Sequence, residues 1–103
     1  MSLPVALRPE AQADVLAARR WYENQREGLG DAFEERLDEV FARISKMPEL
    51  CEVVLRGVRR GKLRRFPYLV YYRVFTDRIE VIGVLHGSRN PLVWQDRVRE
   101  DRE

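Results

Sequence analysis

The stretch KLRRFPYLVYYRVFTDRIEVIGVLHGSR, from Lys62 to Arg89, carries the clearest fold signal in the chain. It begins with a basic cluster and continues as two runs, LVYYRVF and IEVIGVLH, that are rich in β-branched and aromatic residues. Such residues favour strands, and the TDR between the runs predicts a tight turn. Because nearly every residue of both runs is apolar, we expect two central strands of a sheet joined as a hairpin.

Residues 9–26 are predicted to form a first helix. Pro9 suits the first turn, where its missing N–H costs nothing, and the segment EGLGD breaks the helix. Trp21 and Tyr22 are expected to pack this helix on the sheet. Four apolar residues recur on one helical face: Ala11, Val15, Ala18 and Tyr22.

A second helix is predicted after the break. Asp31 and Glu34 have the spacing of a capping box, which favours a helix start at Asp31. Pro48 ends the helix, because proline disfavours the helical conformation of the residue before it. The two helices then form an antiparallel hairpin. The apolar stripe of the second helix comprises Phe33, Leu37, Val40, Phe41 and Ile44.

The remaining segments complete an α+β fold. Residues 3–8 are predicted to form a short strand, and the segment LRGVRRGKLRRF a loosely alternating one, where Gly57 and Gly61 suggest a bulge. The segment NPLVWQDRVRE favours a short C-terminal helix starting near Pro91. The predicted order is β-α-α-β-β-β. It describes a small antiparallel β-sheet with the N-terminal helical hairpin packed on one face.

Length and composition narrow the classes of protein further. The 103 residues predict a single domain spanning 1–103. No apolar stretch approaches the roughly 20 residues that cross a bilayer, so a cytoplasmic protein is expected. One cysteine, Cys51, excludes an internal disulfide, and a single histidine, His86, argues against a zinc site. We therefore expect no metal and no cofactor.

The charge is unevenly distributed along the chain. The net charge is only +2, yet residues 53–76 contain seven basic side chains and no acidic one. Residues 1–52 contain seven basic and eleven acidic side chains. The basic block is suited to a polyanion or to an acidic protein segment, and it exceeds what is needed to protect a strand edge from aggregation.

Three segments in this order resemble the ParE/RelE superfamily, the toxins of type II toxin–antitoxin modules of the plasmid-stabilisation type. They are EAQADVLAARRWYENQREGLGDAF, LRRFPYLVYYRV and VIGVLHGSRNPLVW, and together they cover most of the chain. The resemblance implies a cognate antitoxin, a toxin–antitoxin hetero-oligomer and one of two activities. RelE-like members cleave mRNA on the ribosome, whereas ParE-like members poison DNA gyrase without nuclease activity.

Metal-free RNA cleavage needs groups that transfer protons and cations that stabilise the phosphorane. By resemblance, the two lysines of the RelE-like basic strand fall at Arg60 and Lys62, and an arginine is a poor proton acceptor. The hairpin arginine falls at Leu69, and the late tyrosine at Trp94, whose indole neither gives nor takes a proton at neutral pH. The electrostatic residues are kept, whereas the proton-transfer residues are largely lost.

His86 could restore proton transfer, because its ordinary pKa suits acid–base catalysis. The nuclease alternative therefore rests on His86, Lys62, Arg65 and Arg89. The competing interpretation of His86 is a hydrogen bond to a neighbouring loop.

The sequence favours the ParE-like branch: a toxin that binds a protein target, gyrase, through its basic surface and C-terminal segment. An acidic, partly disordered antitoxin would neutralise it. The alternatives are a ribosome-dependent mRNA endonuclease, which would bind ribosome and mRNA, and a non-toxic RNA-binding module. The residues predicted to bind target or antitoxin are Arg56, Arg59, Arg60, Lys62, Arg64, Arg65, Arg89 and Trp94.

Overall fold

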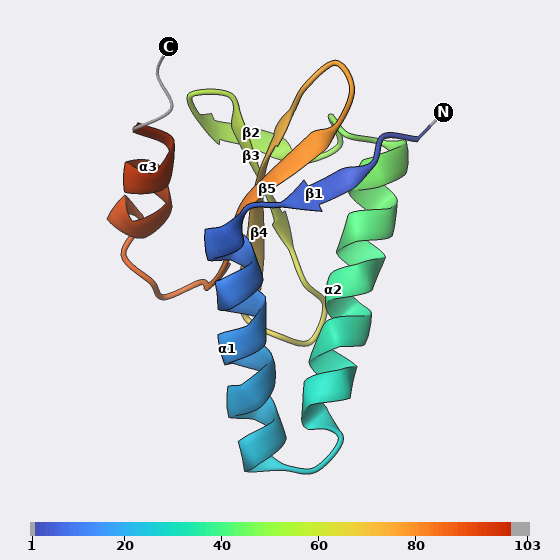
Figure 1. Ribbon diagram of the computed structural model, residues 1–103, viewed down its shortest axis with the longest axis vertical. Coiled ribbons are helices and arrows are strands. Elements are labelled where there is room, and N and C mark those ends of the chain that lie inside the picture. Colours follow the sequence, from blue (N-terminus) through green and yellow to red (C-terminus); the bar gives the residue numbers. More distant parts are fainter. Residues whose placement is uncertain (1, 100–103) are drawn as a thin grey trace.

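A five-stranded sheet in the order β1-β5-β4-β3-β2 forms the centre of the protein (Figure 1). The structure, a computed structural model, describes residues 2–99. The strands are β1 (Val5–Leu7), β2 (Glu52–Leu55), β3 (Val58–Lys62), β4 (Tyr68–Val74) and β5 (Ile79–His86). The helices are α1 (Pro9–Gln25), α2 (Leu29–Lys46) and α3 (Leu92–Arg99).

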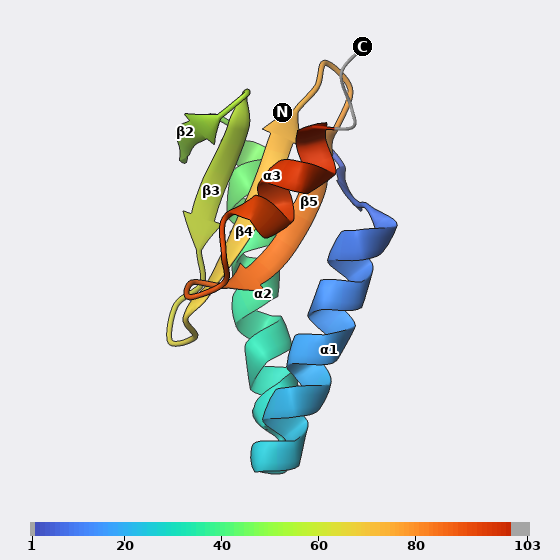
Figure 2. The same cartoon turned by 90° about the vertical axis from the view of Figure 1, so that its left-hand side faces the viewer.

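The helices lie on opposite sides of this sheet. The α1–α2 hairpin covers one face and projects beyond the end of the sheet, whereas α3 lies on the other side (Figure 2). β1 pairs in parallel with β5, and the other neighbours pair antiparallel. The predicted α+β architecture with a helical hairpin on one face is confirmed. The sheet is mixed and has one more strand than the predicted order.

The main hydrophobic core lies between the helical hairpin and the sheet. The apolar stripe of α2 supplies Phe33, Leu37, Val40 and Ile44, all at most 2% exposed. They pack with Val70 of β4 and with residues of β5. The predicted stripe is therefore the core face of α2, and its helical spacing explains why one helix side is apolar.

A second, smaller core lies on the other face of the sheet. Trp94 of α3 stacks on Tyr71 of β4 with ring centroids 4.8 Å apart. Val58, Ile82, Leu85 and Val98 complete this cluster. Tyr72 faces the main core, so Tyr71 and Tyr72 point to opposite faces, as alternation along a strand predicts.

A β-bulge interrupts the pairing of β4 with β5. Tyr71 pairs with Gly83 and Tyr72 with Val81, so Ile82 is the extra residue. The bulge shifts the phase of β5, and the backbone oxygen of Ile82 and N–H of Val84 therefore point to the strand edge that β1 does not cover.

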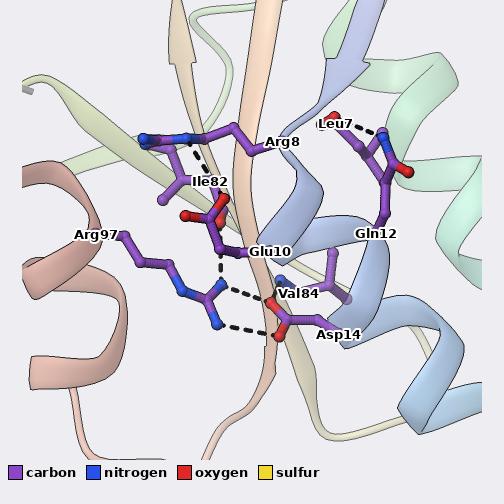
Figure 3. Close-up of polar contacts among 8 residues, drawn as sticks. All are labelled: Leu7, Arg8, Glu10, Gln12, Asp14, Ile82, Val84 and Arg97. Atoms are coloured by element: carbon purple, nitrogen blue, oxygen red, sulfur yellow. Dashed lines mark hydrogen bonds and ion pairs between the residues drawn. The ribbon is translucent and has the colours of Figure 1, made fainter.

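Two polar side chains cover this open edge of β5 (Figure 3). Asp14 of α1 accepts a hydrogen bond from the N–H of Val84 at 3.0 Å, and Arg97 of α3 donates to the carbonyl of Ile82 at 3.0 Å. The two side chains also form a bidentate ion pair, with N–O distances of 2.7 and 3.1 Å. This pair, called the α1–α3 clamp below, joins the helices on opposite sides of the sheet.

Gly83 leaves room for the clamp. A Cβ atom at this position would lie 2.7 Å from Nη1 of Arg97 and 3.3 Å from Oδ2 of Asp14. Both distances are tighter than ordinary van der Waals contacts, so the glycine allows the guanidinium to approach the strand edge.

The predicted capping box at the start of the second helix is wrong. α2 begins at Leu29, after Gly28 in the left-handed conformation with φ of 88°. The carboxylate of Glu23 accepts hydrogen bonds from the N–H groups of Gly28 and Gly30, both at 3.0 Å. It takes the role expected of Asp31, because α1 brings it against the first turn of α2. Asp31 pairs instead with Arg19 of α1.

The segment before the central hairpin is also different from the prediction. It was expected to be one bulged strand, but it is a hairpin of β2 and β3. Its turn residues Arg56 and Gly57 have positive φ angles of 54° and 77°, the pattern of a two-residue hairpin turn. Gly57 therefore forms a turn, whereas Gly61 lies within β3, where a Cβ would be 3.1 Å from Sγ of Cys51. The C-terminal helix was predicted correctly.

Candidate functional site

The basic residues of segment 56–65, called the basic segment below, follow β3 from one end to the other. Arg56 lies in the turn before β3, and Arg64 and Arg65 lie in the loop that leads to β4. The predicted basic strand is therefore a strand with a charged loop at each end. Because a strand rises by roughly 3.3 Å per residue, Arg56 and Arg65 mark the ends of an elongated surface.

Ion pairs and backbone contacts engage half of these cations. Arg60 pairs with Glu52 at 2.6 Å, and Arg64 contacts Glu39 at 3.7 Å. Arg59 donates to the carbonyl of Cys51 at 2.6 Å and so fastens the start of β2. The hydrogen bond that Arg60 donates to the Glu52 carboxylate is the main reason that the pKa of Arg60 is raised. These three side chains therefore stabilise the fold in addition to contributing positive charge.

The other half of the basic segment has no acidic partner within residues 2–99. These side chains are Arg56, Lys62 and Arg65. Lys62 and Arg65 also line a shallow pocket together with Phe66 and Pro67. An unpaired cation adds its full charge to the surface potential, so these residues contribute most to attraction of an acidic partner.

Both unpaired arginines of the basic segment have strained backbone. Arg56 and Arg65 have φ of 54° and 70°, and they are the non-glycine residues with positive φ among residues 2–99. An L residue in this conformation costs about 1–2 kcal/mol relative to glycine. Strained backbone often marks a functional position, where the side chain matters more than local stability.

His86 and Arg89 lie apart from Lys62. They line a pocket of about 460 Å³ between α1 and the end of β5, together with Asp14, Trp21 and Tyr68. Nδ1 of His86 is 2.8 Å from the hydroxyl oxygen of Ser88 and also accepts the Ser88 N–H at 3.0 Å. Burial raises the pKa of Tyr68 in the same pocket.

The register of the sheet separates the nuclease candidates further. Lys62 pairs with Leu69, which pairs with Leu85 on the face of the second core. His86 pairs with Tyr68, whose ring packs against the main core. Lys62 and His86 therefore point to opposite faces, and Arg65 and Arg89 line different pockets. The four candidates do not form one reaction centre in this structure.

The structure places the two tryptophans differently from the sequence-based expectations. Trp94, expected to bind target or antitoxin, is 4% exposed because it stacks on Tyr71 beneath α3. Trp21, expected to pack α1 on the sheet, is 57% exposed, and only Tyr22 packs in the core. A correct assignment needed the rotation of each helix about its axis, which neighbouring aromatic residues do not define.

Arg26 and Arg36, which the sequence did not indicate, line a pocket together with Arg65. Helical basic residues are common on solvated faces, so no local signal distinguished them. Residues 2–99 contain no group of three His, Cys, Asp or Glu side chains arranged to hold a metal ion. In the same part of the chain no helix is long and apolar enough to cross a membrane.

Comparison with known proteins adds a family and two similar folds. Residues 5–91 match the ParE toxin of the type II toxin–antitoxin system, parDE. A structure of the chromosomal ParDE system from P. aeruginosa superposes with a TM-score of 0.62 at 15% identity, covering 82% of this chain and 96% of the other. A mutant of the E. coli toxin RelE in the free state superposes with a TM-score of 0.74 at 18% identity, covering 99% and 100%. No curated protein sequence matched.

Proposed function

Because this chain belongs to the ParE toxin family of type II toxin–antitoxin systems, we propose that it acts by binding DNA gyrase and that a cognate antitoxin neutralises it. The proposal includes the absence of RNA cleavage. It assigns the basic segment to protein recognition and gives no catalytic role to His86.

One observation carries the choice against nuclease activity: Lys62 and His86 point to opposite faces of the sheet. General acid–base catalysis needs the acid and the base within hydrogen-bonding reach of one substrate. His86 also has its Nδ1 engaged by Ser88, in keeping with a structural role at the end of β5. The cations that remain can attract a partner without transferring protons.

The unpaired charges support an acidic partner. Arg56, Lys62 and Arg65 extend along the outer part of the sheet without acidic partners among the described residues. An acidic, partly disordered antitoxin would gain charge-assisted contacts here as it orders on the surface. Its protease-sensitive unbound state would then allow the toxin to be released.

The test is a pair of assays on the purified protein. One measures supercoiling of relaxed plasmid by gyrase, and the other measures cleavage of a defined mRNA on programmed ribosomes. We expect loss of supercoiling and intact mRNA. The variant Lys62→Gln/Arg65→Gln should restore supercoiling, whereas His86→Ala should inhibit gyrase as the wild type does.

A matched control removes two cations elsewhere. Arg20→Gln/Arg43→Gln lowers the charge equally at exposed helical positions outside the basic segment. It should inhibit like the wild type. If the wild type cuts mRNA at the ribosome and His86→Ala loses about 10²–10⁴ of that rate, the endonuclease alternative replaces the gyrase proposal.

A further inference from the structure

A second basic site lies beneath the projecting end of the helical hairpin. Here a pocket of about 420 Å³ lies between α1, α2 and the loop that joins β3 to β4. Figures 1 and 2 show that the hairpin extends past the end of the sheet, and the pocket lies where the β3–β4 loop meets this hairpin. The lining residues are Tyr22, Arg26, Leu29, Ala32, Arg36, Arg65, Phe66 and Pro67.

Three arginines from three different segments converge on this pocket. Arg26 follows α1, Arg36 belongs to α2, and Arg65 belongs to the β3–β4 loop. Arg36 donates to Glu39 at 2.6 Å, but neither Arg26 nor Arg65 has an acidic partner within residues 2–99. Unpaired guanidinium groups that face one cavity bind carboxylates and phosphates well.

Arg65 connects this pocket to the basic segment. It lines both this pocket and the shallow one beside Lys62, and it holds a left-handed backbone with φ of 70°. A glycine there would relieve the strain. An arginine at position 65 instead places a positive charge between the two pockets, and this charge is a reason for the strained residue to be an arginine.

The floor of the pocket is apolar, and its aromatic rings contact other rings of the core. The ring of Tyr22 stacks on Phe33 at 5.5 Å and meets the edge of Phe66 at 4.8 Å. Phe66 is 8% exposed and also packs edge-on against Phe33 at 5.4 Å. Nucleic-acid bases bind by stacking on open rings, and these rings already face one another. Leu29, Ala32 and Pro67 complete a floor that fits an aliphatic side chain.

We propose that this pocket binds an acidic peptide segment, with an aliphatic side chain on the floor and flanking carboxylates on Arg26 and Arg65. Identifying the segment as part of the antitoxin rests on the proposed function, whereas the pocket and its preference do not. The site extends the interaction surface from β3 around to the end of the helical hairpin. An extended partner could therefore contact both Lys62 and Arg26 through the shared Arg65.

The experiment measures peptide binding to the full chain by fluorescence anisotropy. The probe is a fluorescein-labelled peptide in which a leucine is flanked on each side by two glutamates. Arg26→Gln and Arg65→Gly should each weaken binding about tenfold, as expected for loss of a charge-assisted hydrogen bond. Arg20→Gln, at an exposed position of α1, is the control and should bind like the wild type.

Two further arms separate the possible ligands. A peptide with asparagine in place of leucine should bind more weakly, because it does not bury an aliphatic group on the floor. A labelled single-stranded oligonucleotide should bind weakly, and its binding should not respond to Arg26→Gln. Equal peptide binding by wild type and Arg26→Gln/Arg65→Gly would overturn the proposal. So would an oligonucleotide that displaces the peptide and depends on both arginines.

The result is independent of the gyrase assay. A toxin that inhibits gyrase but shows no peptide site would retain the proposed function and lose this inference. A chain that binds the peptide but has no effect on gyrase would retain this inference and lose the proposed function.

Discussion

Single residues in this protein balance local stability against charge. Arg56 occupies a hairpin turn whose geometry favours Asn, Asp or Gly, and its φ of 54° places a long side chain in left-handed backbone. Glu23, in contrast, stabilises the local structure, because its carboxylate accepts hydrogen bonds from two N–H groups at the start of α2. Substitutions at these two positions should therefore shift stability in opposite directions.

Arg56→Gly should raise the free energy of unfolding by about 1 kcal/mol, because glycine adopts positive φ without a steric penalty. Urea denaturation followed by circular dichroism measures the change. Arg43→Gly is the matched control, since the same substitution inside α2 should cost about 1 kcal/mol. A destabilising Arg56→Gly would mean that the arginine makes favourable contacts that outweigh the strain.

Glu23 should make stability depend on pH in the acid range. The hydrogen bonds from the Gly28 and Gly30 N–H groups, with the nearby charge of Arg19, lower the pKa of its carboxyl below the ordinary value of 4.5. The folded protein therefore binds this proton more weakly than the unfolded chain. The stabilisation is complete above the ordinary pKa and is lost as pH falls through the lower, folded value.

Glu23→Gln should accordingly lower the melting temperature at neutral pH, and the difference from the wild type should shrink on acidification. Thermal denaturation at a series of pH values measures both. Glu27→Gln, a carboxyl two residues past the end of α1, serves as the control. A gap between Glu23→Gln and wild type that stays constant down to pH values well below the ordinary pKa would contradict the assignment.

At the scale of elements, the α1–α3 clamp holds the molecule together across the sheet. The Asp14 and Arg97 side chains are 12% and 16% exposed, and each also binds the backbone of β5. The need arises because β1 ends opposite Val81, so backbone groups of β5 beyond that residue face an edge that lacks a strand. The clamp satisfies those groups where a further strand would otherwise do so.

Removal of one clamp partner should be costly because the other then remains largely buried with its charge unpaired. Arg97→Met should destabilise the fold by about 3 kcal/mol, and Asp14→Asn by a similar amount. The double variant should cost less than the two single changes together, because neither charge is then left alone. Denaturant unfolding of the four proteins of this cycle measures the coupling.

Gly83→Ala offers an independent check of the same geometry. Its methyl group would meet the guanidinium of Arg97, so it should destabilise the wild type but have little further effect in the Arg97→Met background. If Gly83→Ala destabilised both backgrounds equally, the clamp would not depend on the close approach of the Arg97 guanidinium to Gly83.

These elements also explain which features the sequence could predict. The α2 stripe and the central hairpin follow from periodic patterns, because each periodicity reflects one buried face. The clamp joins residues 83 positions apart, and no local pattern connects them. The Glu23 cap and the burial of Trp94 likewise depend on how two elements pack. The charge of the basic segment was evident from composition, whereas its pairing with Glu52 and Glu39 required the fold.

At the scale of the whole molecule, charge is concentrated where elements end. Lys62 ends β3, Arg65 lies in the following loop, and Arg26 follows α1. Three acidic residues of α2 pair with arginines of neighbouring segments: Asp31, Glu34 and Glu39. This separation concentrates positive charge along β3 and at the projecting end of the helical hairpin, although the net charge of the protein is only +2. Long-range attraction then acts mainly on the rate at which an acidic partner associates.

The association rate with the cognate antitoxin should therefore depend on salt and on the unpaired cations. We expect the rate constant to fall as ionic strength rises from low to physiological values, because the Debye length shortens from about 30 Å to about 8 Å. Lys62→Gln/Arg65→Gln should lower the rate at low salt by about tenfold and flatten the salt dependence. Stopped-flow fluorescence of Trp21, which is exposed on α1, gives the signal.

Arg20→Gln/Arg43→Gln removes as many charges from the helices and should retain most of the salt dependence. If both double variants respond to salt alike, only net charge steers the encounter, and the basic segment has no special part in it.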